Sequence, residues 1–144
     1  MIILDANIFL YAYDSNSEKH AEARAWVEKL LSEGGLVGIP WQTAYAFLRV
    51  VTHPKLPAPR FSMAEAAGIV DDWHAQPNVR FLGPGEQHWN VLRRMLLDGQ
   101  ARGPLVTDAQ LAALTIEHGG ELNTTDRDFA RFPGLRWNNP LEER

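Results

Sequence analysis

The stretch that decides the fold is MIILDANIFLYAYD, residues 1–14. Its first four residues form a continuous apolar run, which is typical of a strand buried on both faces of a sheet. The next residue, Asp5, is acidic, and the apolar character then returns from Ile8 to Ala12. An acidic residue that interrupts a hydrophobic segment calls for a physical reason, which we seek in the other carboxylates of the chain.

Size and composition limit the classes of function. With 144 residues, 45% of them hydrophobic, the chain has enough apolar material for one domain spanning residues 1–144. It contains no cysteine, which excludes disulfides, thiolate metal sites and cysteine nucleophiles. The formal net charge of −4 argues against a broad basic face for nucleic acid. Any contact with nucleic acid must therefore use a local basic patch or metal ions held by carboxylates.

The termini and the hydropathy pattern indicate a soluble protein. The N-terminus has no basic segment before its apolar run, so we expect no secretory signal. Every apolar run is too short to span a bilayer. We therefore expect a cytoplasmic protein that does not associate with membranes.

Short apolar runs alternate with helical patterns along the chain. This alternation predicts an α/β fold with a mainly parallel central sheet of four or five strands flanked by helices. Along the helix expected from about residue 86 to 101, Trp89, Leu92 and Leu96 are predicted to face the core. The strands are expected at residues 1–4, 36–40, 78–82, 121–125 and 135–137, the other helices at 17–32, 41–52, from 62 onward and 108–118, and a Pro-rich loop at 53–61.

Three aspartates are predicted to meet at one edge of the sheet. Asp5 directly follows the first strand and Asp126 follows the fourth. Asp108 opens the helix that leads into the fourth strand, so it lies at the same end. Because parallel strands all end at one edge, where ligand sites form in α/β sheets, we expect the three carboxylates to be close together.

Helix capping is the alternative explanation for each aspartate taken singly, since Asp is a favoured N-cap residue. Three negative charges at one rim, with Asp128 nearby, would raise one another's pKa and oppose folding unless a cation joins them. A hard divalent ion with oxygen ligands, Mg²⁺ or Mn²⁺, is the natural partner of such a cluster. The sequence therefore favours a metal site over capping alone, although one Asp can do both.

Three segments resemble the PIN-domain family, and within it the VapC-type toxins of bacterial toxin–antitoxin pairs. They are LDANIFLYA near the N-terminus, VTDAQLAA at residues 106–113 and NTTDRDFARF at residues 123–132. The segments FLRVVTHP (47–54) and GLRWNNPL (134–141) are similar to a subgroup of those toxins. The resemblance covers nearly the whole chain and implies the PIN-like three-layer sandwich.

The resemblance also implies a function, that of a metal-dependent endoribonuclease. The family's catalytic and metal-binding acids fall on Asp5, Asp108 and Asp126, with Asp128 in an accessory position. The implied cofactor is Mg²⁺ or Mn²⁺, and the implied substrate is RNA, such as tRNA or another structured RNA. The implied partners are a VapB-type antitoxin, whose tail inserts a basic side chain near the acids, and a second copy of the chain in a homodimer.

One position departs from the family pattern. Many members carry a Glu on the third helix, where this chain has Ala46, which cannot bind a metal ion. Gln42, one helical turn earlier, is an accessory candidate, and surface polarity explains it equally well. The alternative function is therefore a catalytically inert PIN-like module that binds RNA or protein.

Substrate contacts are expected around the acidic motif. Arg127 lies between two site aspartates, and Thr124 and Asn7 occupy polar positions of the family motifs, so these three are predicted to bind substrate. For any single Arg, surface ion pairing is the alternative. Aromatic side chains can stack on unpaired RNA bases; the candidates are Tyr13, Trp41 and Trp137, and for the tryptophans core packing is the favoured interpretation.

A groove for the antitoxin helix is expected from an excess of apolar side chains over what a small sheet needs. Ordinary core packing is the alternative for at least some of them. These side chains are Tyr11, Tyr13, Trp26, Phe47 and Val51.

Overall fold

The first apolar run forms the central strand of the sheet in the computed structural model, which describes residues 1–55 and 61–142. Strand β1 (Ile2–Leu4) pairs in parallel with β2 (Val37–Pro40) on one side and with β4 (Glu121–Asn123) on the other. Strand β3 (Val79–Leu82) pairs with β2, and β5 (Trp137–Asn138) with β4, both in parallel. The strand order within the described residues is β3-β2-β1-β4-β5, and each of these pairings is parallel.

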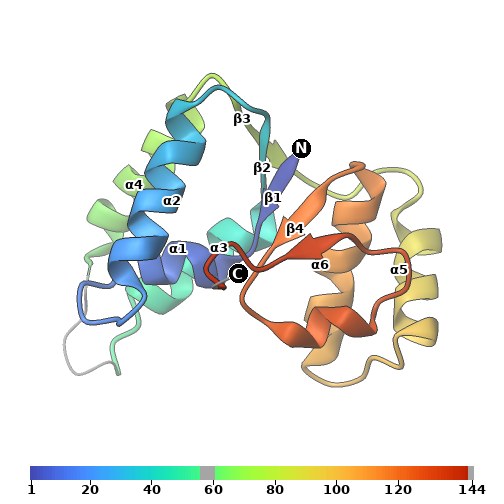
Figure 1. The fold of residues 1–144 in the computed structure, drawn as a ribbon. Coiled ribbons are helices and arrows are strands. Elements are labelled where there is room, and N and C mark those ends of the chain that lie inside the picture. Colours follow the sequence, from blue (N-terminus) through green and yellow to red (C-terminus); the bar gives the residue numbers. More distant parts are fainter. Residues whose placement is uncertain (56–60, 143–144) are drawn as a thin grey trace.

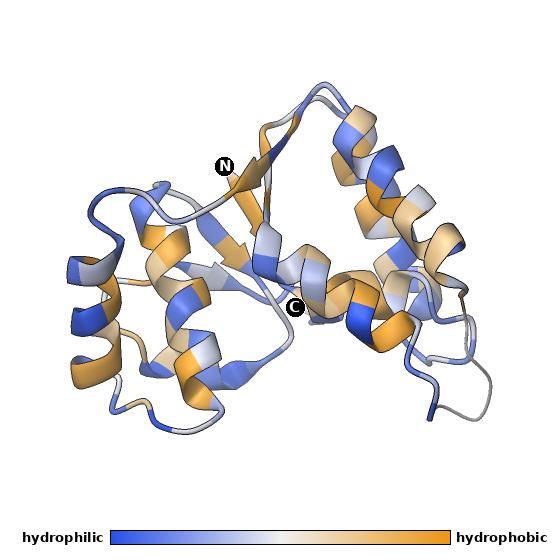
Figure 2. Ribbon diagram, turned by 180° about the vertical axis from the view of Figure 1, so that it is seen from behind, coloured by the Kyte–Doolittle hydropathy of each residue, from blue (hydrophilic) through white to orange (hydrophobic). Residues whose placement is uncertain are grey.

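Helices cover both faces of this sheet, which confirms the predicted sandwich of three layers (Figure 1). One hydrophobic cluster joins β1 and β2 to the first four helices, and a second cluster joins the sheet to the remaining ones. Figure 2 shows that the hydrophobic residues gather on the strands and on parts of each helix. The helices are α1 (Ala6–Ala12), α2 (His20–Ser32), α3 (Trp41–Val51) and α4 (Met63–Ala75) on one side, and α5 (His88–Asp98), α6 (Leu105–Glu117) and the 3₁₀ helix η1 (Arg127–Arg131) on the other.

Burial on both faces explains why β1 is uniformly apolar. Ile3 and Leu4 are both 0% exposed. Successive side chains of a strand point to opposite faces, and these two accordingly belong to the two different clusters. A polar residue at either position would lie inside one of the cores, so the first position available to an acid is the one after the strand.

Several boundaries differ from the predicted ones. Helix α6 begins at Leu105, three residues earlier than expected, so Asp108 lies in its first turn rather than at its start. Trp89, expected to face the core, is 62% exposed, because the buried side of α5 runs through Leu92 and Met95. The predicted Pro-rich loop falls partly on residues 56–60, which lie outside the described residues.

The capping box predicted before α4 is present. The Ser62 hydroxyl accepts a hydrogen bond from the Glu65 backbone N–H, and the Glu65 carboxylate accepts one from the Ser62 backbone N–H. Among the residues described, we find no helix with the length and hydrophobicity needed to cross a membrane.

Candidate active site

Asp5 lies at the end of the central strand and is fixed on both oxygens. Its Oδ1 accepts a hydrogen bond of 2.7 Å from the Ala6 backbone N–H at the start of α1. Its Oδ2 accepts one of 2.8 Å from the Thr124 hydroxyl, which follows β4. Burial raises the pKa of the Asp5 carboxyl above its ordinary value, and although these two hydrogen bonds act to lower it, the nearby Asp126 charge raises it further.

Thr124 makes hydrogen bonds through its hydroxyl with three other residues of the site. Its side chain is 0% exposed, and its hydroxyl donates to Asp5. The same oxygen accepts hydrogen bonds from the Asp126 backbone N–H at 3.1 Å and from the Asn7 side-chain Nδ2 at 3.2 Å. The donor and both lone pairs of the hydroxyl are therefore used. One buried oxygen thus sets the relative positions of Asp5, Asn7 and Asp126.

This arrangement leaves one acceptor unsatisfied. Because the Asn7 Nδ2 faces Thr124, its Oδ1 faces elsewhere, and that atom is buried with no hydrogen-bond partner within residues 1–55 and 61–142. A buried acceptor without a donor costs free energy, so such an atom is a place to look for a missing ligand. An amide oxygen is one of the donors that hard divalent cations accept.

Asp126 and Asp128 stand at the start of η1. The Asp126 Oδ1 accepts a hydrogen bond of 2.9 Å from the Asp128 backbone N–H, so Asp126 is the N-cap of this short helix. The Asp128 side chain is exposed. Asp126 is therefore held by its own loop as well as by Thr124.

Asp108 differs from the other two predicted ligands because no capping bond explains it. Its helix starts at Leu105, and no hydrogen bond to the Asp108 carboxylate occurs in the part of the chain that the structure describes. Partial burial, followed by the charges of Asp126, Asp5 and Asp128, raises the pKa of Asp108 from 3.8 to about 6, while Arg131 acts to lower it. Helix capping thus accounts for two of the three aspartates but not for the third.

Helix α3 is tied to the residues that precede two of these aspartates. The Thr43 hydroxyl donates to the Leu4 carbonyl at 2.8 Å, and the Gln42 Nε2 donates to the Thr107 carbonyl at 3.4 Å. Ala46 follows Gln42 by one helical turn and so lies on the same side of α3. The first turn of α3 is therefore fixed relative to the start of α1 and the start of α6.

The donor set suits a hard cation in kind and in charge. Neighbouring carboxylates help to raise the pKa of Asp5 and of Asp108, and the Asn7 amide oxygen is buried without a partner among the described residues. Within the described residues, however, no three His, Asp or Glu side chains form a ready-made metal-binding group. The residues present therefore fit Mg²⁺ or Mn²⁺ by the chemistry of their oxygen donors.

Comparison with known protein families decides what kind of domain carries this site. The PIN domain family matches residues 2–135. The chain belongs to the PIN domain family. The ribonuclease VapC37 of Mycobacterium tuberculosis is 40% identical over 141 residues, covering 97% of each chain. The ribonuclease VapC33 of the same species is 36% identical over 143 residues, covering 99% of this chain and 100% of that protein.

Solved PIN domain structures have the same fold. VapC20 of Mycobacterium tuberculosis, described as a toxin that cleaves the sarcin–ricin loop, has a TM-score of 0.66 at 16% identity, covering 94% of this chain and 99% of that one. The VapBC-1 structure from nontypeable Haemophilus influenzae has a TM-score of 0.67 at 20% identity, covering 99% and 100%. At these identities the likeness concerns the fold.

In this PIN domain, the cation predicted to bind substrate is already paired. The Arg127 Nη2 lies 2.8 Å from the Glu142 Oε1, and the two side chains are 81% and 52% exposed. An ion pair this exposed contributes little to stability and exchanges readily with other partners. Arg127 remains a predicted substrate contact, and binding there would replace Glu142.

The predicted aromatic and groove residues fall into two groups. Phe47 and Val51 are 0% and 1% exposed, so their assignment to a docking groove was wrong and they belong to the core. Tyr13 is partly buried against the same cluster. Trp41, for which core packing was the favoured interpretation, is 39% exposed. The remaining candidates, Tyr11, Trp26 and Trp137, are partly buried.

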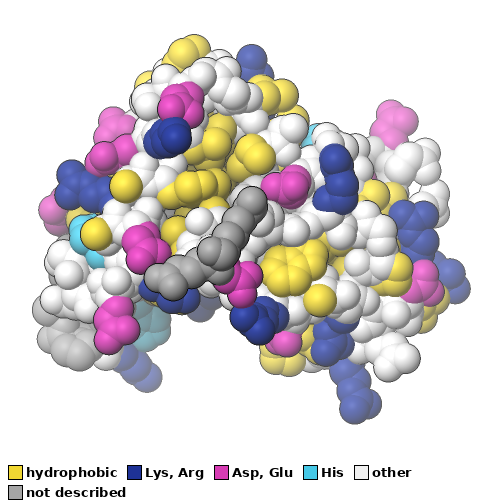
Figure 3. Space-filling view, in the orientation of Figure 1, with side chains coloured by type: hydrophobic (Ala, Val, Ile, Leu, Met, Phe, Trp, Pro, Cys, Tyr) yellow, Lys and Arg dark blue, Asp and Glu magenta, His cyan; other side chains and the backbone are white. Residues whose placement is uncertain are grey.

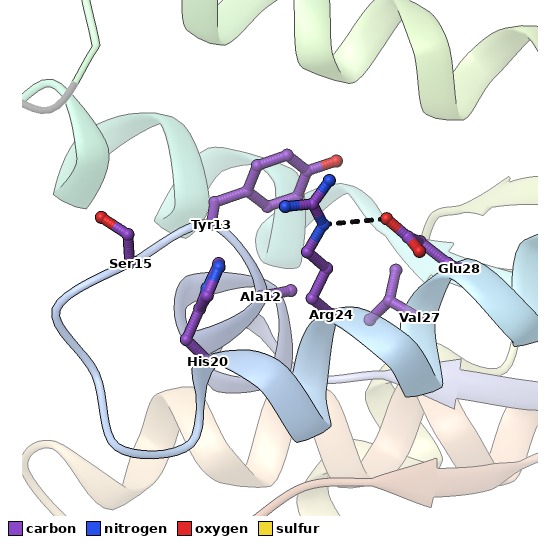
Figure 4. Close-up of a pocket in the computed structure, with 7 residues that line it drawn as sticks. All are labelled: Ala12, Tyr13, Ser15, His20, Arg24, Val27 and Glu28. Atoms are coloured by element: carbon purple, nitrogen blue, oxygen red, sulfur yellow. Dashed lines mark hydrogen bonds and ion pairs between the residues drawn. The ribbon is translucent and has the colours of Figure 1, made fainter.

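A pocket lies away from the acidic residues. It has a volume of about 380 Å³ and lies between the end of α1 and the start of α2. Figure 4 shows the Arg24–Glu28 pair, 2.9 Å apart, beside the Tyr13 ring. None of the predicted metal ligands lines this pocket, so it is not the metal site. Its lining residues are Ala12, Tyr13, Ser15, His20, Arg24, Val27 and Glu28.

Proposed function

We propose that this PIN domain is a metal-dependent endoribonuclease, the toxin of a toxin–antitoxin pair. The observation that carries the proposal is the set of mutually repelling carboxylates at the carboxyl edge of the sheet, in which Asp108 accepts no hydrogen bond from any residue that the structure describes. A cluster of this kind destabilises the fold unless it binds a cation, so a structural role alone does not explain it. The curated relatives named as ribonucleases support the same assignment.

Asp5, Asp108 and Asp126 would hold Mg²⁺ or Mn²⁺, which when bound supplies an activated water and neutralises charge at the scissile phosphate. The protein contributes the positions of the ligands. Thr124 fixes one oxygen of Asp5 through a buried hydrogen bond, and the Ala6 N–H fixes the other. Each of these oxygens keeps a lone pair for a further contact.

Two other polar groups complete the proposed site. The unsatisfied Asn7 Oδ1 is placed to accept a hydrogen bond from bound water or from a substrate hydroxyl. Thr124 has no exposed surface, so in this proposal it positions Asp5 rather than contacting RNA. Arg127 is assigned to the RNA phosphates, in exchange for Glu142.

Cleavage of RNA by the wild type and by Asp5→Asn, with Mg²⁺ or Mn²⁺ supplied, tests the proposal. The exposed Asp71 on α4 provides a matched control, because Asp71→Asn makes the same chemical change far from the site in sequence and element. We expect Asp5→Asn to lose at least 100-fold in rate, in the range typical of losing a principal electrostatic group, and Asp71→Asn to retain wild-type activity. Equal cleavage by the wild type and Asp5→Asn would refute the enzyme assignment.

The inert RNA- or protein-binding module is the second candidate, and Ala46 is the observation that favours it. In the nuclease, cleavage requires added metal and disappears with chelation. In an inert module, purified wild-type protein binds RNA but leaves it intact at every metal concentration. A time course of RNA length with Mg²⁺, with Mn²⁺ and with a chelator separates the two.

We further propose a VapB-type antitoxin as the partner of the chain. Related solved structures are VapBC assemblies, one of them from Rickettsia felis bound to a promoter DNA fragment. Figure 3 shows hydrophobic side chains at the surface between the helical half containing α2 and the half containing β4, with acidic side chains around them. An amphipathic segment with basic side chains is complementary to such a surface. A homodimer in the cytoplasm, where RNA is available, is the expected state of the free toxin.

A further inference from the structure

Helix α3 presents an exposed stripe of two aromatic side chains and a cation. Trp41 is 39% exposed and Tyr45 is 61% exposed. Their rings are stacked, with centroids 6.1 Å apart and an interplanar angle of 27°. Arg49, four residues further along, is also exposed and is on the same face of the helix. In the view from behind, α3 crosses the middle of the molecule (Figure 2).

The Trp41 ring is supported from beneath. It packs against the Phe81 ring of β3, with centroids 4.5 Å apart and an interplanar angle of 31°. Phe81 in turn stacks on His74 of α4, at 5.1 Å. A ring held in this way loses little further freedom when a ligand packs against its exposed surface, which favours binding.

The stripe is also rigidly connected to the acidic residues. The two residues that follow Trp41 are Gln42 and Thr43, which donate to the Thr107 and Leu4 carbonyls. These carbonyls belong to the residues directly before Asp108 and Asp5. The aromatic stripe therefore begins at the same edge of the sheet as the proposed active site, and its position relative to that site is fixed.

The exposed area decides what kind of ligand fits. A large aromatic side chain offers about 150–250 Å² in total, so two rings that are about half exposed present roughly one ring's worth of area. A stable interface between two copies of a chain needs about 800 Å² from each, which is several times more. One nucleobase needs a single ring face, and a neighbouring cation suits its phosphate. The stripe on its own is therefore too small for a dimer interface, whereas its size and charge match one unpaired nucleotide.

We propose that Trp41 and Tyr45 form a base-stacking platform, with Arg49 as its phosphate contact, that seats an unpaired RNA nucleotide beside the acidic residues. The proposal rests on the proposed nuclease function and adds a residue set that selects unpaired RNA. It explains why two large aromatic side chains are exposed at the start of a helix whose other aromatic, Phe47, is fully buried. Any base can stack on an aromatic ring, so the platform should distinguish unpaired from paired RNA but not one base sequence from another.

Binding of a fluorescein-labelled 12-residue oligoadenylate to proteins carrying Asp5→Asn, which prevents cleavage, tests the platform. We expect Trp41→Leu to raise the dissociation constant by about 10- to 100-fold, the range measured for loss of one stacked base. Trp41→Phe, which keeps a ring, should retain most of the affinity. Trp89→Leu removes an even more exposed Trp, from α5, and should change the affinity by less than about twofold.

A second variant guards against misfolding. Tyr45 is mostly exposed, so Tyr45→Leu should leave the unfolding temperature unchanged and still weaken RNA binding by about fivefold or more. In active protein, Trp41→Leu should raise the KM for unpaired RNA and leave kcat within about threefold. Unchanged affinity in both Leu variants would overturn the platform, as would conversion of a dimer into a monomer by Trp41→Leu in analytical ultracentrifugation.

The nuclease proposal and the platform fail separately. If wild-type protein binds the oligoadenylate but cleaves no RNA with either metal, the nuclease assignment falls, whereas a loss of binding in Trp41→Leu still supports the platform. If the wild type cleaves RNA and Trp41→Leu binds and cleaves equally well, the platform falls and the nuclease assignment stands.

Discussion

Replacing Asp108 with Asn should make the metal-free protein more stable. The unfolded chain has an Asp pKa near 3.9, whereas the pKa of Asp108 in the folded protein is about 6. Between these values the folded state binds more protons than the unfolded state, so its free energy of unfolding falls as the pH rises through this window. At pH 7.5 the full penalty is present, and below about pH 4 it is absent. Asp108→Asn removes the charge that causes it.

The magnitude follows from the same difference in pKa. For a fully buried group it would correspond to about 3 kcal/mol. Asp108 is only partly buried, so solvent screening reduces the expected gain to about 1 kcal/mol. Losing a negative charge in the first turn of α6 costs about 0.3–1 kcal/mol and acts in the opposite direction. We therefore expect Asp108→Asn to be about 0.5 kcal/mol more stable than the wild type at pH 7.5 without metal, and no more stable at pH 4.

Urea unfolding at both pH values, with a chelator and then with saturating Mg²⁺, measures these differences. At a Mg²⁺ concentration 100 times its dissociation constant, the wild type should gain about 2.7 kcal/mol, whereas Asp108→Asn should gain much less. The order of stability of the two proteins should therefore reverse when metal is added. Asp71→Asn, with its exposed side chain, should follow the wild type in both conditions. A variant that is less stable than the wild type without metal, or equal stabilisation of both proteins by Mg²⁺, would refute the reasoning.

Two further substitutions test the rest of the site. Thr124→Val keeps the shape of a fully buried side chain and removes the hydroxyl that makes hydrogen bonds with three neighbours. We expect it to lower the free energy of unfolding by about 1–3 kcal/mol. We also expect kcat for RNA cleavage to fall at least tenfold. Thr43→Val, which removes a single buried hydrogen bond from α3, is the control and should cost stability without the loss in kcat. Ala46→Glu should raise Mg²⁺ affinity by about tenfold in calorimetry and destabilise the metal-free protein at pH 7.5, because it adds another carboxylate on the Gln42 side of α3. Unaltered Mg²⁺ affinity would show that Ala46 faces away from the ion.

The main features of the fold were predictable because they depend on short-range patterns. The run at residues 1–4 was expected to be buried on both faces, and Ile3 and Leu4 lie in two different cores. The order of strands and helices followed from hydrophobic periodicity, and the shared edge of a parallel sheet then placed Asp5 and Asp126 near each other. Boundaries were less accurate, as the early start of α6 shows.

The chemistry of individual side chains depended on packing that periodicity does not encode. Thr124 was expected to bind substrate, but its complete burial follows from the way β4 leaves the sheet beside β1. Trp41 and Trp89 were both expected in the core, because a large aromatic residue in a helical pattern is usually buried. Each lies in the first turn of its helix, before the first buried residue of that helix. Whether a side chain in a first turn is covered depends on the neighbouring elements, which the sequence pattern does not reveal.

The pairing of β1 with β4 determines the position of Asp5, the acid that interrupts the first apolar segment. The Asp5 backbone N–H donates to the Asn123 carbonyl at 3.1 Å, and the next residue, Thr124, donates its hydroxyl to the Asp5 carboxylate. The backbone register that builds the sheet therefore also positions two of the proposed ligands, since Asp126 is held by the same hydroxyl. The sheet thus holds these negative charges near one another by its own hydrogen bonds. In the proposed nuclease, a cation bound there would relieve their repulsion, and this relief would contribute to its affinity.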